Sequence, residues 1–251
     1  MPNGAIGTVA NVATRAVEGA VRLASARTGI DFGYLIAQAR LESGLNPQAK
    51  SARSSATGLY QFTTATWLDT VRRHGAEHGL GWAANALKDG AAALGHETRT
   101  AILALRNDAQ ASASMAAEYA ADNRDALESR LGHAVGSTEL YLAHFLGSTG
   151  AARFLTANDR NAATSAAEVA PAAARSNRSV FFAVDGRARS VGEVLQRFAE
   201  KLGAAGSALT ATTGNAVPPT GNDLPVAPLS TRDLNQRQLA AMLTPRLDRN
   251  A

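Results

Sequence analysis

Glu42 is the residue in this sequence whose type and position best suit acid–base chemistry. It is the final acidic residue of a short helix that the sequence predicts between a cap at Asp31 and a stop at Gly44. With about 100° per residue, Glu42 shares a helix face with Leu35 and Ala39, so its carboxyl group is expected to be partly desolvated. Desolvation and the negative end of the helix dipole both raise the pKa of a carboxyl group, which favours a general acid. A solvated glutamate at a helix end is the alternative that this pattern leaves open.

Residues 58–62, Gly-Leu-Tyr-Gln-Phe, supply groups that are suited to binding sugars. The amide of Gln61 can form hydrogen bonds with hydroxyl or acetamido groups, and the rings of Tyr60 and Phe62 can stack on sugar faces. The alternative is a loop that re-enters the hydrophobic core through Leu59 and Phe62. This segment is therefore a candidate glycan-binding loop downstream of the candidate acid.

The elements that position these residues are predicted to be helices. Hydrophobic residues make up 45% of the 251 residues, but 55 residues are alanines, which bury little area and strongly favour helix. No stretch alternates polar and apolar residues for long enough to require a strand, although a short hairpin around residues 50–62 is compatible with the sequence. We therefore predict an all-α fold with helices at residues 14–29, 32–43, 64–75, 82–94, 98–105, 109–131, 138–146 and 149–157.

The ordered motifs of residues 42–67 resemble the lysozyme-like catalytic domain of the soluble lytic transglycosylases. The resemblance rests on four segments in the family's order, with a slightly longer loop at residues 52–57. They are Glu42-Ser43, Asn46-Pro47-Gln48-Ala49-Lys50-Ser51, Gly58-Leu59-Tyr60-Gln61 and Thr66-Trp67. The resemblance covers residues 12–157 and implies a lysozyme-like (SLT) fold.

The resemblance also implies a reaction on peptidoglycan. Glu42 would protonate the oxygen between N-acetylmuramic acid and N-acetylglucosamine, while the acetamido group of the substrate stabilises C1. The same carboxylate would then remove the proton of the C6 hydroxyl, which closes a 1,6-anhydro ring. This non-hydrolytic cleavage of the β-1,4 bond needs no cofactor, no metal and no second carboxylate, unlike the reaction of most glycosidases. A hydrolytic muramidase is the alternative if Asp69 or Glu77 faces Glu42.

A third family segment departs from the usual pattern in this sequence. Residues 143–147 are Ala-His-Phe-Leu-Gly, with His144 where the family has Tyr and Phe145 where it has Asn. His144 and Tyr141, one helical turn earlier, are the candidates to replace that Tyr, which supports the substrate and the catalytic carboxyl group. The altered segment also leaves open a catalytically impaired protein that binds peptidoglycan or acts as a scaffold. The substrate-binding residues that the resemblance implies are Ser43, Tyr60, Gln61, Phe62, Tyr141 and His144.

Charge and composition argue against several other classes of protein. The net charge of +4 arises from 25 basic residues, 22 Arg and three Lys, that are dispersed along the chain, so nucleic-acid binding is not expected. No run of about 20 apolar residues predicts a transmembrane segment, and there is no cysteine for thiol chemistry. His74 and His78 have the spacing of a helical metal site, but Gly75 and Gly79 disfavour a rigid helix there, so no metal is predicted.

The sequence divides into three parts by composition. Residues 12–160 form the predicted lysozyme-like transglycosylase domain. Residues 161–202 are predicted as an accessory linker and a helix that starts with the capping box Ser190–Glu193. Residues 203–251 are predicted to be a disordered tail rich in Pro, Ala and Thr, in which residues 234–243 could form a partner-binding helix.

The third family segment, together with residues 180–202, resembles a subgroup found near flagellar and secretion machinery. It implies local wall remodelling for a cell-envelope machine, with peptidoglycan strands as substrate and flagellar or secretion-machine proteins as partners of the tail. Residues 1–20 lack the basic start and apolar stretch of a secretory signal. Because the substrate lies outside the inner membrane, we predict a periplasmic or wall-associated enzyme, exported by a specialised apparatus or starting upstream of Met1.

Overall fold

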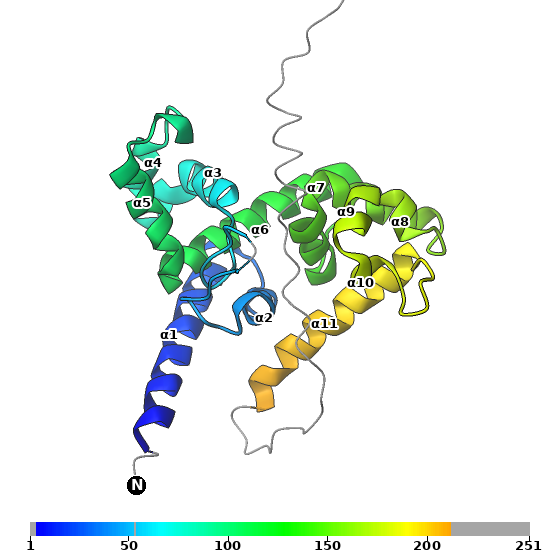
Figure 1. Ribbon diagram of the computed structural model, residues 1–251, viewed down its shortest axis with the longest axis horizontal. Helices are drawn as coiled ribbons and strands as arrows, with labels where there is room; N and C mark the ends of the chain where they lie inside the picture. The colour runs from blue at the N-terminus through cyan, green and yellow to red at the C-terminus, as the bar shows by residue number, and fades with distance from the viewer. Residues whose placement is uncertain (1–3, 53, 212–251) are drawn as a thin grey trace, which may run out of the picture.

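The computed structural model describes residues 4–52 and 54–211, which form helices joined by loops that contain a few isolated β-bridges (Figure 1). The predicted all-α fold is confirmed. Within the described residues, no helix has the length and apolar character needed to cross a membrane. The α-helices are α1 (Gly4–Thr28), α2 (Phe32–Ser43), α3 (Thr64–His74), α4 (Gly81–Ala86), α5 (His96–Ala104), α6 (Ala109–Leu131), α7 (Ser137–Arg160), α8 (Ala166–Val169), α9 (Pro171–Ser176), α10 (Arg178–Phe181) and α11 (Val191–Ala211), and short 3₁₀ helices lie at η1 (Gly75–His78), η2 (Ala91–Ala93) and η3 (Leu105–Asn107).

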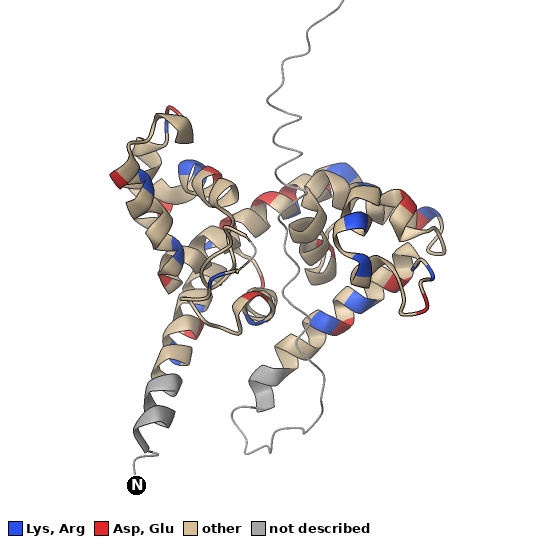
Figure 2. Ribbon diagram, in the orientation of Figure 1, with Lys and Arg blue, Asp and Glu red and all other residues tan. Residues whose placement is uncertain are grey.

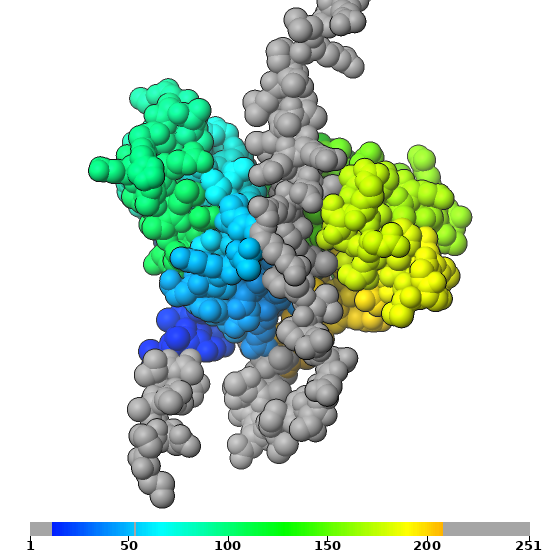
Figure 3. Space-filling model, viewed as in Figure 1, coloured from blue at the N-terminus to red at the C-terminus, as the bar shows by residue number. Residues whose placement is uncertain are grey.

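Helix α6 crosses the middle of the molecule and packs against α1 and α7 (Figure 1). Its first half is almost entirely small residues, and Ser112, Ala113 and Ala117 are fully buried. Small side chains let neighbouring helix backbones approach closely, which explains why an alanine-rich segment forms the centre of the core. Figure 3 shows the two sides of the molecule, with α3 to α5 on one side and α8 to α10 on the other.

Helix α2 begins and ends at the residues that the sequence predicts. The Asp31 carboxylate accepts a hydrogen bond from the Tyr34 backbone N–H at 2.7 Å, and Gly44 closes the helix in the left-handed conformation with φ of 64°. Thr63 caps α3 in the same way. These local signals place the C-terminal end of α2 beside the loop at residues 44–63.

Several predicted helices differ from the observed ones. The predicted helix at 82–94 ends at Ala86, and the turn that follows at residues 87–89 leads to Gly90, whose positive φ of 92° excludes a helix through that position. The predicted helices at 138–146 and 149–157 merge into α7, but Gly147 has φ 72° and ψ 156° inside it, so the chain is kinked where the break was predicted. The hairpin considered for residues 50–62 consists only of isolated bridges, from Thr57 to Lys50 and to Phe62.

Helix α11 follows the predicted capping box and packs on α2 and α7. The Ser190 N–H donates to the Glu193 carboxylate at 2.8 Å, and the Glu193 N–H donates to the Ser190 hydroxyl at 3.1 Å. The predicted helix end at Leu202 is wrong, since α11 continues to Ala211 through Gly203. Flanking alanines sustain the helix there. The rest of the predicted tail, residues 212–251 with its 234–243 segment, lies outside the described residues.

Acidic and basic side chains are interspersed over the helices in the view of Figure 2. Several of them form local pairs, such as Arg187 with Glu193 at 2.7 Å and Arg72 with Asp69 at 2.8 Å. The dispersed distribution along the helices agrees with the charge pattern of the sequence.

Candidate active site

Glu42 lies in the last turn of α2, and only 8% of its side chain is exposed. Its Oε1 atom is 3.2 Å from Nε2 of His144, which comes from α7. The fold therefore brings the predicted acid into direct contact with His144, one of the predicted substrate-binding residues.

Aromatic side chains surround the pair formed by Glu42 and His144. The Tyr141 ring is stacked on the His144 ring at 6.0 Å, and the Tyr119 ring meets it edge-on at 6.4 Å. Burial, followed by the nearby negative charge of Glu42, raises the pKa of Tyr141. Burial also raises the pKa of Tyr34, with a contribution from Tyr141 and Glu42. These phenols therefore stay neutral and act as hydrogen-bonding or packing groups.

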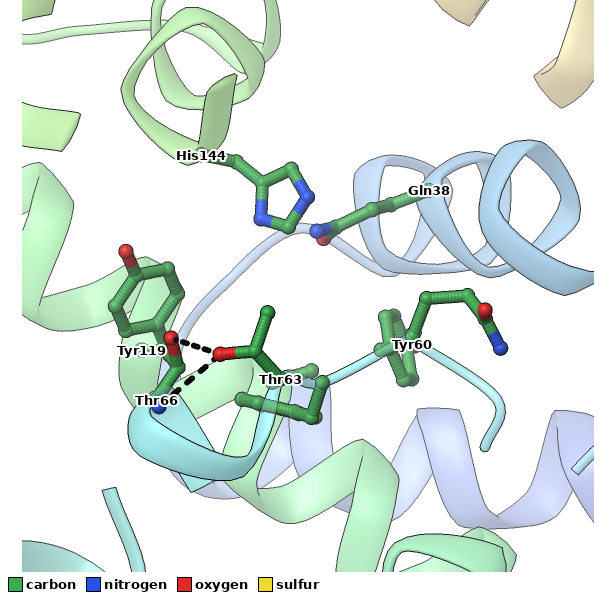
Figure 4. Close-up of a pocket in the computed structure, with 9 residues that line it drawn as sticks. Gln38, Tyr60, Thr63, Thr66, Tyr119 and His144 are labelled. Carbon is green, nitrogen blue, oxygen red and sulfur yellow. Dashed lines mark hydrogen bonds between the residues drawn. The ribbon is translucent and has the colours of Figure 1, made fainter. Parts of the chain in front are cut away.

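A cavity that His144 helps to line lies between α2, α3, α6, α7 and the loop before α3 (Figure 4). It is lined by Gln38, Tyr60, Gln61, Phe62, Thr63, Thr66, Ala116, Tyr119 and His144. Glu42 is linked to this cavity through His144. Four of the predicted substrate-binding residues, Tyr60, Gln61, Phe62 and His144, are thus brought together at one site.

Two polar atoms at the cavity have no hydrogen-bond partner within the described part of the chain. They are Oε1 of Gln38 and Nδ1 of His144, and both are buried. Figure 4 shows the two side chains pointing toward one another from α2 and α7. Buried polar atoms are normally satisfied, so these two atoms are available to hydrogen-bond a small polar group inside the cavity.

The loop before α3 is held in shape by backbone contacts from a buried arginine. The Arg106 guanidinium donates to the carbonyl oxygens of Ser55 at 2.7 Å and Phe62 at 3.1 Å. Gly58 has φ of 87°, and a Cβ atom there would lie 1.9 Å from the Arg106 carbonyl oxygen, so only glycine fits. Gln61 also has a positive φ of 48°, and its amide nitrogen donates to the Gly58 carbonyl oxygen at 2.9 Å. The loop that presents Gln61 to the cavity is therefore tightly constrained.

Two of the predicted substrate-binding residues lie outside the cavity lining. The Ser43 hydroxyl contacts the carbonyl oxygens of Ala39 at 3.0 Å and Leu59 at 2.8 Å, so it joins the end of α2 to the loop. Tyr141 is buried and backs the His144 ring, while its own ring packs edge-on against Phe198 of α11 at 5.4 Å. Both residues have the geometry of positioning groups.

Other lining residues were not identified from the sequence. Gln38 is one helical turn before Glu42 on α2, and that spacing was a usable signal. Tyr119 is the lone aromatic residue of the alanine-rich helix α6, which composition alone marks only as a packing helix. Thr63, Thr66 and Ala116 complete the missed set. Their side chains reach the site only through the packing of α3 against α6.

The two acids considered as partners for a hydrolytic reaction are engaged elsewhere. The carboxylate of Asp69 is 2.8 Å from Arg72 and 3.0 Å from Arg73 on α3. Glu77 is exposed on η1, where its carboxylate lies close to His74 and Glu118. Neither residue lines the cavity beside His144. The geometry thus offers no support for either acid as a second catalytic carboxylate.

Comparison with protein families matches residues 19–100 to the transglycosylase SLT domain. Residues 19–100 therefore carry a domain of the transglycosylase SLT family, as the motifs of residues 42–67 predicted. Enzymes of this family are peptidoglycan lytic transglycosylases, which are lyases. The match includes α2, the loop and α3, and it ends before α6 and α7 contribute Tyr119 and His144.

Proposed function

We propose that Glu42 is the single catalytic acid and base of a non-hydrolytic cleavage of peptidoglycan. The observation that supports this proposal best is the buried Glu42 carboxyl group in contact with His144, beside a cavity with unsatisfied polar atoms. The bond cut is the β-1,4 linkage between N-acetylmuramic acid and N-acetylglucosamine. The product is a glycan that ends in 1,6-anhydro-N-acetylmuramic acid.

The proposed reaction uses the Glu42 carboxyl group twice. First, protonated Glu42 gives its proton to the glycosidic oxygen, and the bond between that oxygen and C1 of N-acetylmuramic acid breaks. The substrate's own acetamido oxygen stabilises the positive charge at C1. Ionised Glu42 then takes the proton of the C6 hydroxyl, and O6 bonds to C1. The carboxyl group ends in its starting state, and water is not consumed.

His144 and Tyr141 together are proposed to replace the Tyr that the family carries in this segment. His144 contacts the carboxyl oxygen directly, and the stacked Tyr141 ring limits the motion of the imidazole. A carboxyl group held in one orientation can carry out both proton transfers without first having to reorient. On this proposal the altered segment keeps catalysis, in contrast to the alternative of an impaired binding or scaffolding protein.

We also propose that the catalytic unit of residues 12–160 is completed by α11. Arg40 of α2 donates to the Ala205 carbonyl oxygen of α11 at 2.9 Å, and Phe198 of α11 packs against Tyr141. Burial lowers the pKa of Lys201 on the same helix, and the negative charge of Glu42 acts on that pKa in the opposite direction. The accessory segment therefore supports α2 and α7, the two helices that carry Glu42 and His144.

The decisive experiment compares wild type with Glu42→Gln on purified sacculi, with products identified by mass spectrometry. We expect wild type to release anhydromuramyl products and Glu42→Gln to lose about 10²–10⁴-fold in rate. Glu97→Gln, a change of an exposed acid on α5, is the matched control and should keep full activity. Reducing-end products from wild type would instead indicate a muramidase. Binding of sacculi by wild type without any cleavage would indicate a scaffolding protein.

We also propose that the enzyme acts in the periplasm or at the cell wall, beside a cell-envelope machine. Peptidoglycan as substrate supports a periplasmic or wall-associated enzyme, and the resemblance to a machine-associated subgroup supports recruitment by flagellar or secretion proteins. Deletion of residues 212–251 tests the recruitment step. We expect loss of partner pull-down with lytic activity unchanged, and unaltered pull-down would refute a recruiting role for this segment.

A further inference from the structure

A second cluster of ionisable side chains lies where the end of α3 and η1 meet α6. His74 at the end of α3 and His78 of η1 face α6, and Glu118 and Asp122 of α6 face these two histidines. The side chains of His74 and Glu118 are 19% and 15% exposed, and that of His78 is 3% exposed. The cluster is separate from the residues that line the cavity at His144.

His74 uses both ring nitrogens in this cluster. Nδ1 lies 3.5 Å from Oε2 of Glu118, and Nε2 lies 3.0 Å from Oδ2 of Asp122, which also pairs with Arg73. Metal-ligating histidines almost always donate the second ring N–H to a carboxylate or carbonyl oxygen, which fixes the tautomer and the ring. Nε2 also lies 3.1 Å from Nη1 of Arg73, whose guanidinium donates to the same Asp122 oxygen. Asp122 is placed to accept a hydrogen bond from Nε2 as well, and this tautomer leaves Nδ1 as the ligand atom.

His78 fixes the other carboxylate in a similar way. Its Nε2 atom is 2.6 Å from Oε1 of Glu118, while its buried Nδ1 atom has no partner among the described residues. The proton therefore belongs on Nε2, where it is shared with Oε1 of Glu118. Oε2 of Glu118 remains directed at Nδ1 of His74 and is free to serve as a second ligand atom.

A third ligand atom comes from Glu77 on η1. One atom each from His74, Glu77 and Glu118 lie within 4.8 Å of one another. Zinc bound to nitrogen and oxygen at about 2.0–2.1 Å in tetrahedral geometry separates its ligand atoms by about 3.3 Å. Because the Glu77 side chain is exposed, it can move to reduce its separation from the other two ligand atoms to that distance without disturbing the core.

We propose that His74, Glu77 and Glu118 form a binding site for a divalent transition-metal cation of the zinc class, with Asp122 and His78 as outer hydrogen-bond partners. One imidazole with two carboxylates suits such a cation better than Ca²⁺ or Mg²⁺, which take oxygen ligands. Three protein ligands leave a fourth position for water. A site made by His74 and His78 would need a continuous helix, whereas η1 turns the chain so that Glu77 joins His74 instead.

The proposed cation would brace two helices that also build the cavity at His144. Helix α3 supplies Thr66 near its start and His74 at its end, and α6 supplies Ala116 and Tyr119 on either side of Glu118. A metal bridge between His74 and Glu118 would fix α3 against α6. The expected effect is a more stable fold, because a ligand that binds only the folded state shifts the unfolding equilibrium.

Two measurements test the site on the full metal-free chain without a histidine tag. They are calorimetric titration with Zn²⁺ and thermal unfolding with and without Zn²⁺. We expect one Zn²⁺ per chain and an increase in Tm of about 5 °C or more at a hundredfold excess over Kd. His74→Ala and Glu118→Gln should abolish binding, and Asp122→Asn should weaken it by about 10–100-fold. Glu77→Gln changes an exposed side chain, so it tests the ligand set even if the other variants fail to fold.

Two matched controls separate this site from non-specific binding. His133→Ala removes an exposed histidine outside the cluster, and Asp125→Asn removes an exposed acid on the same helix as Asp122. Both should keep the wild-type affinity. The proposal is overturned if wild type binds no Zn²⁺ at about 100 μM, a concentration at which a site of micromolar Kd is saturated. It is also overturned if the controls weaken binding as much as Glu77→Gln does.

Discussion

Replacement of Phe198 by alanine tests whether α11 is an integral part of the enzyme. The Phe198 side chain is 2% exposed, and its ring meets Tyr141 and Phe145 edge-on, each at 5.4 Å. Loss of a buried phenylalanine ring typically costs about 3–5 kcal/mol, through lost burial and the cavity that remains. Both aromatic contacts are lost together, so we expect about 4 kcal/mol.

The loss should appear in thermal and urea unfolding. For a domain of this size, each kcal/mol lowers Tm by about 2–4 °C, so Phe198→Ala should unfold about 8–16 °C below wild type. Below that temperature, cleavage of sacculi should also slow, because Tyr141 loses the ring that supports it behind His144. Phe198→Leu should retain most of the stability, and Gln196→Ala, on the exposed face of α11, should change it by no more than about 0.5 kcal/mol.

A small effect would refute this reasoning. If Phe198→Ala lowered the free energy of unfolding by less than about 1 kcal/mol, its contacts with α7 would be no better than those of a surface residue. If stability fell as expected and the turnover of folded protein did not change, α11 would support the fold without supporting Glu42 and His144. In that case the catalytic unit would end before α11.

Three further predictions concern the loop, the capping box and the histidine. Gly58→Ala should cost at least about 2 kcal/mol in urea unfolding, since its φ of 87° and the nearby Arg106 carbonyl both exclude a Cβ atom, whereas Gly95→Ala should be tolerated. Hydrogen bonding to Arg187 lowers the pKa of Glu193 from 4.5 to about 2. The stability that the ionised Glu193 confers is therefore present above pH 4.5 and is lost as the pH falls toward 2. The difference in unfolding free energy between wild type and Glu193→Gln should vanish over that range, and a difference that stays constant would contradict this prediction. His144→Ala should lower kcat by up to about 10²-fold with KM less affected, because a misplaced carboxyl group slows proton transfer, and an unchanged kcat would remove His144 from the proposed mechanism.

The parts of the site that sequence could predict are those defined by local signals. Asp31, Gly44 and Thr63 act on backbone groups within a few residues of themselves. The ends of α2 and the start of α3 can therefore be predicted from short stretches of sequence. The same holds for Glu42, whose burial follows from the helical spacing of Leu35 and Ala39. The residue types at 58–62 likewise predict a glycan-binding loop, and the family segments agree with it.

The contacts that sequence could not predict depend on tertiary packing. His144 reaches Glu42 only because α7 packs across α6 and brings the end of α2 within hydrogen-bond distance. Tyr119 reaches the cavity because its alanine-rich helix is central. The end of α11 was placed too early at Leu202, since a glycine is a stop signal only where the following residues do not sustain a helix.

The position of Glu42 is set by contacts from three different parts of the fold. Ser43 joins the end of α2 to the loop through the Leu59 carbonyl oxygen, and Arg40 joins the same turn to α11 through the Ala205 carbonyl oxygen. His144 holds the carboxyl group itself from α7. A group that acts first as acid and then as base gains from such fixed placement, because neither step then has to reorganise the protein. Each tether lies within two residues of Glu42 or contacts it directly, so loss of any one should affect turnover more than it affects the binding of glycan strands.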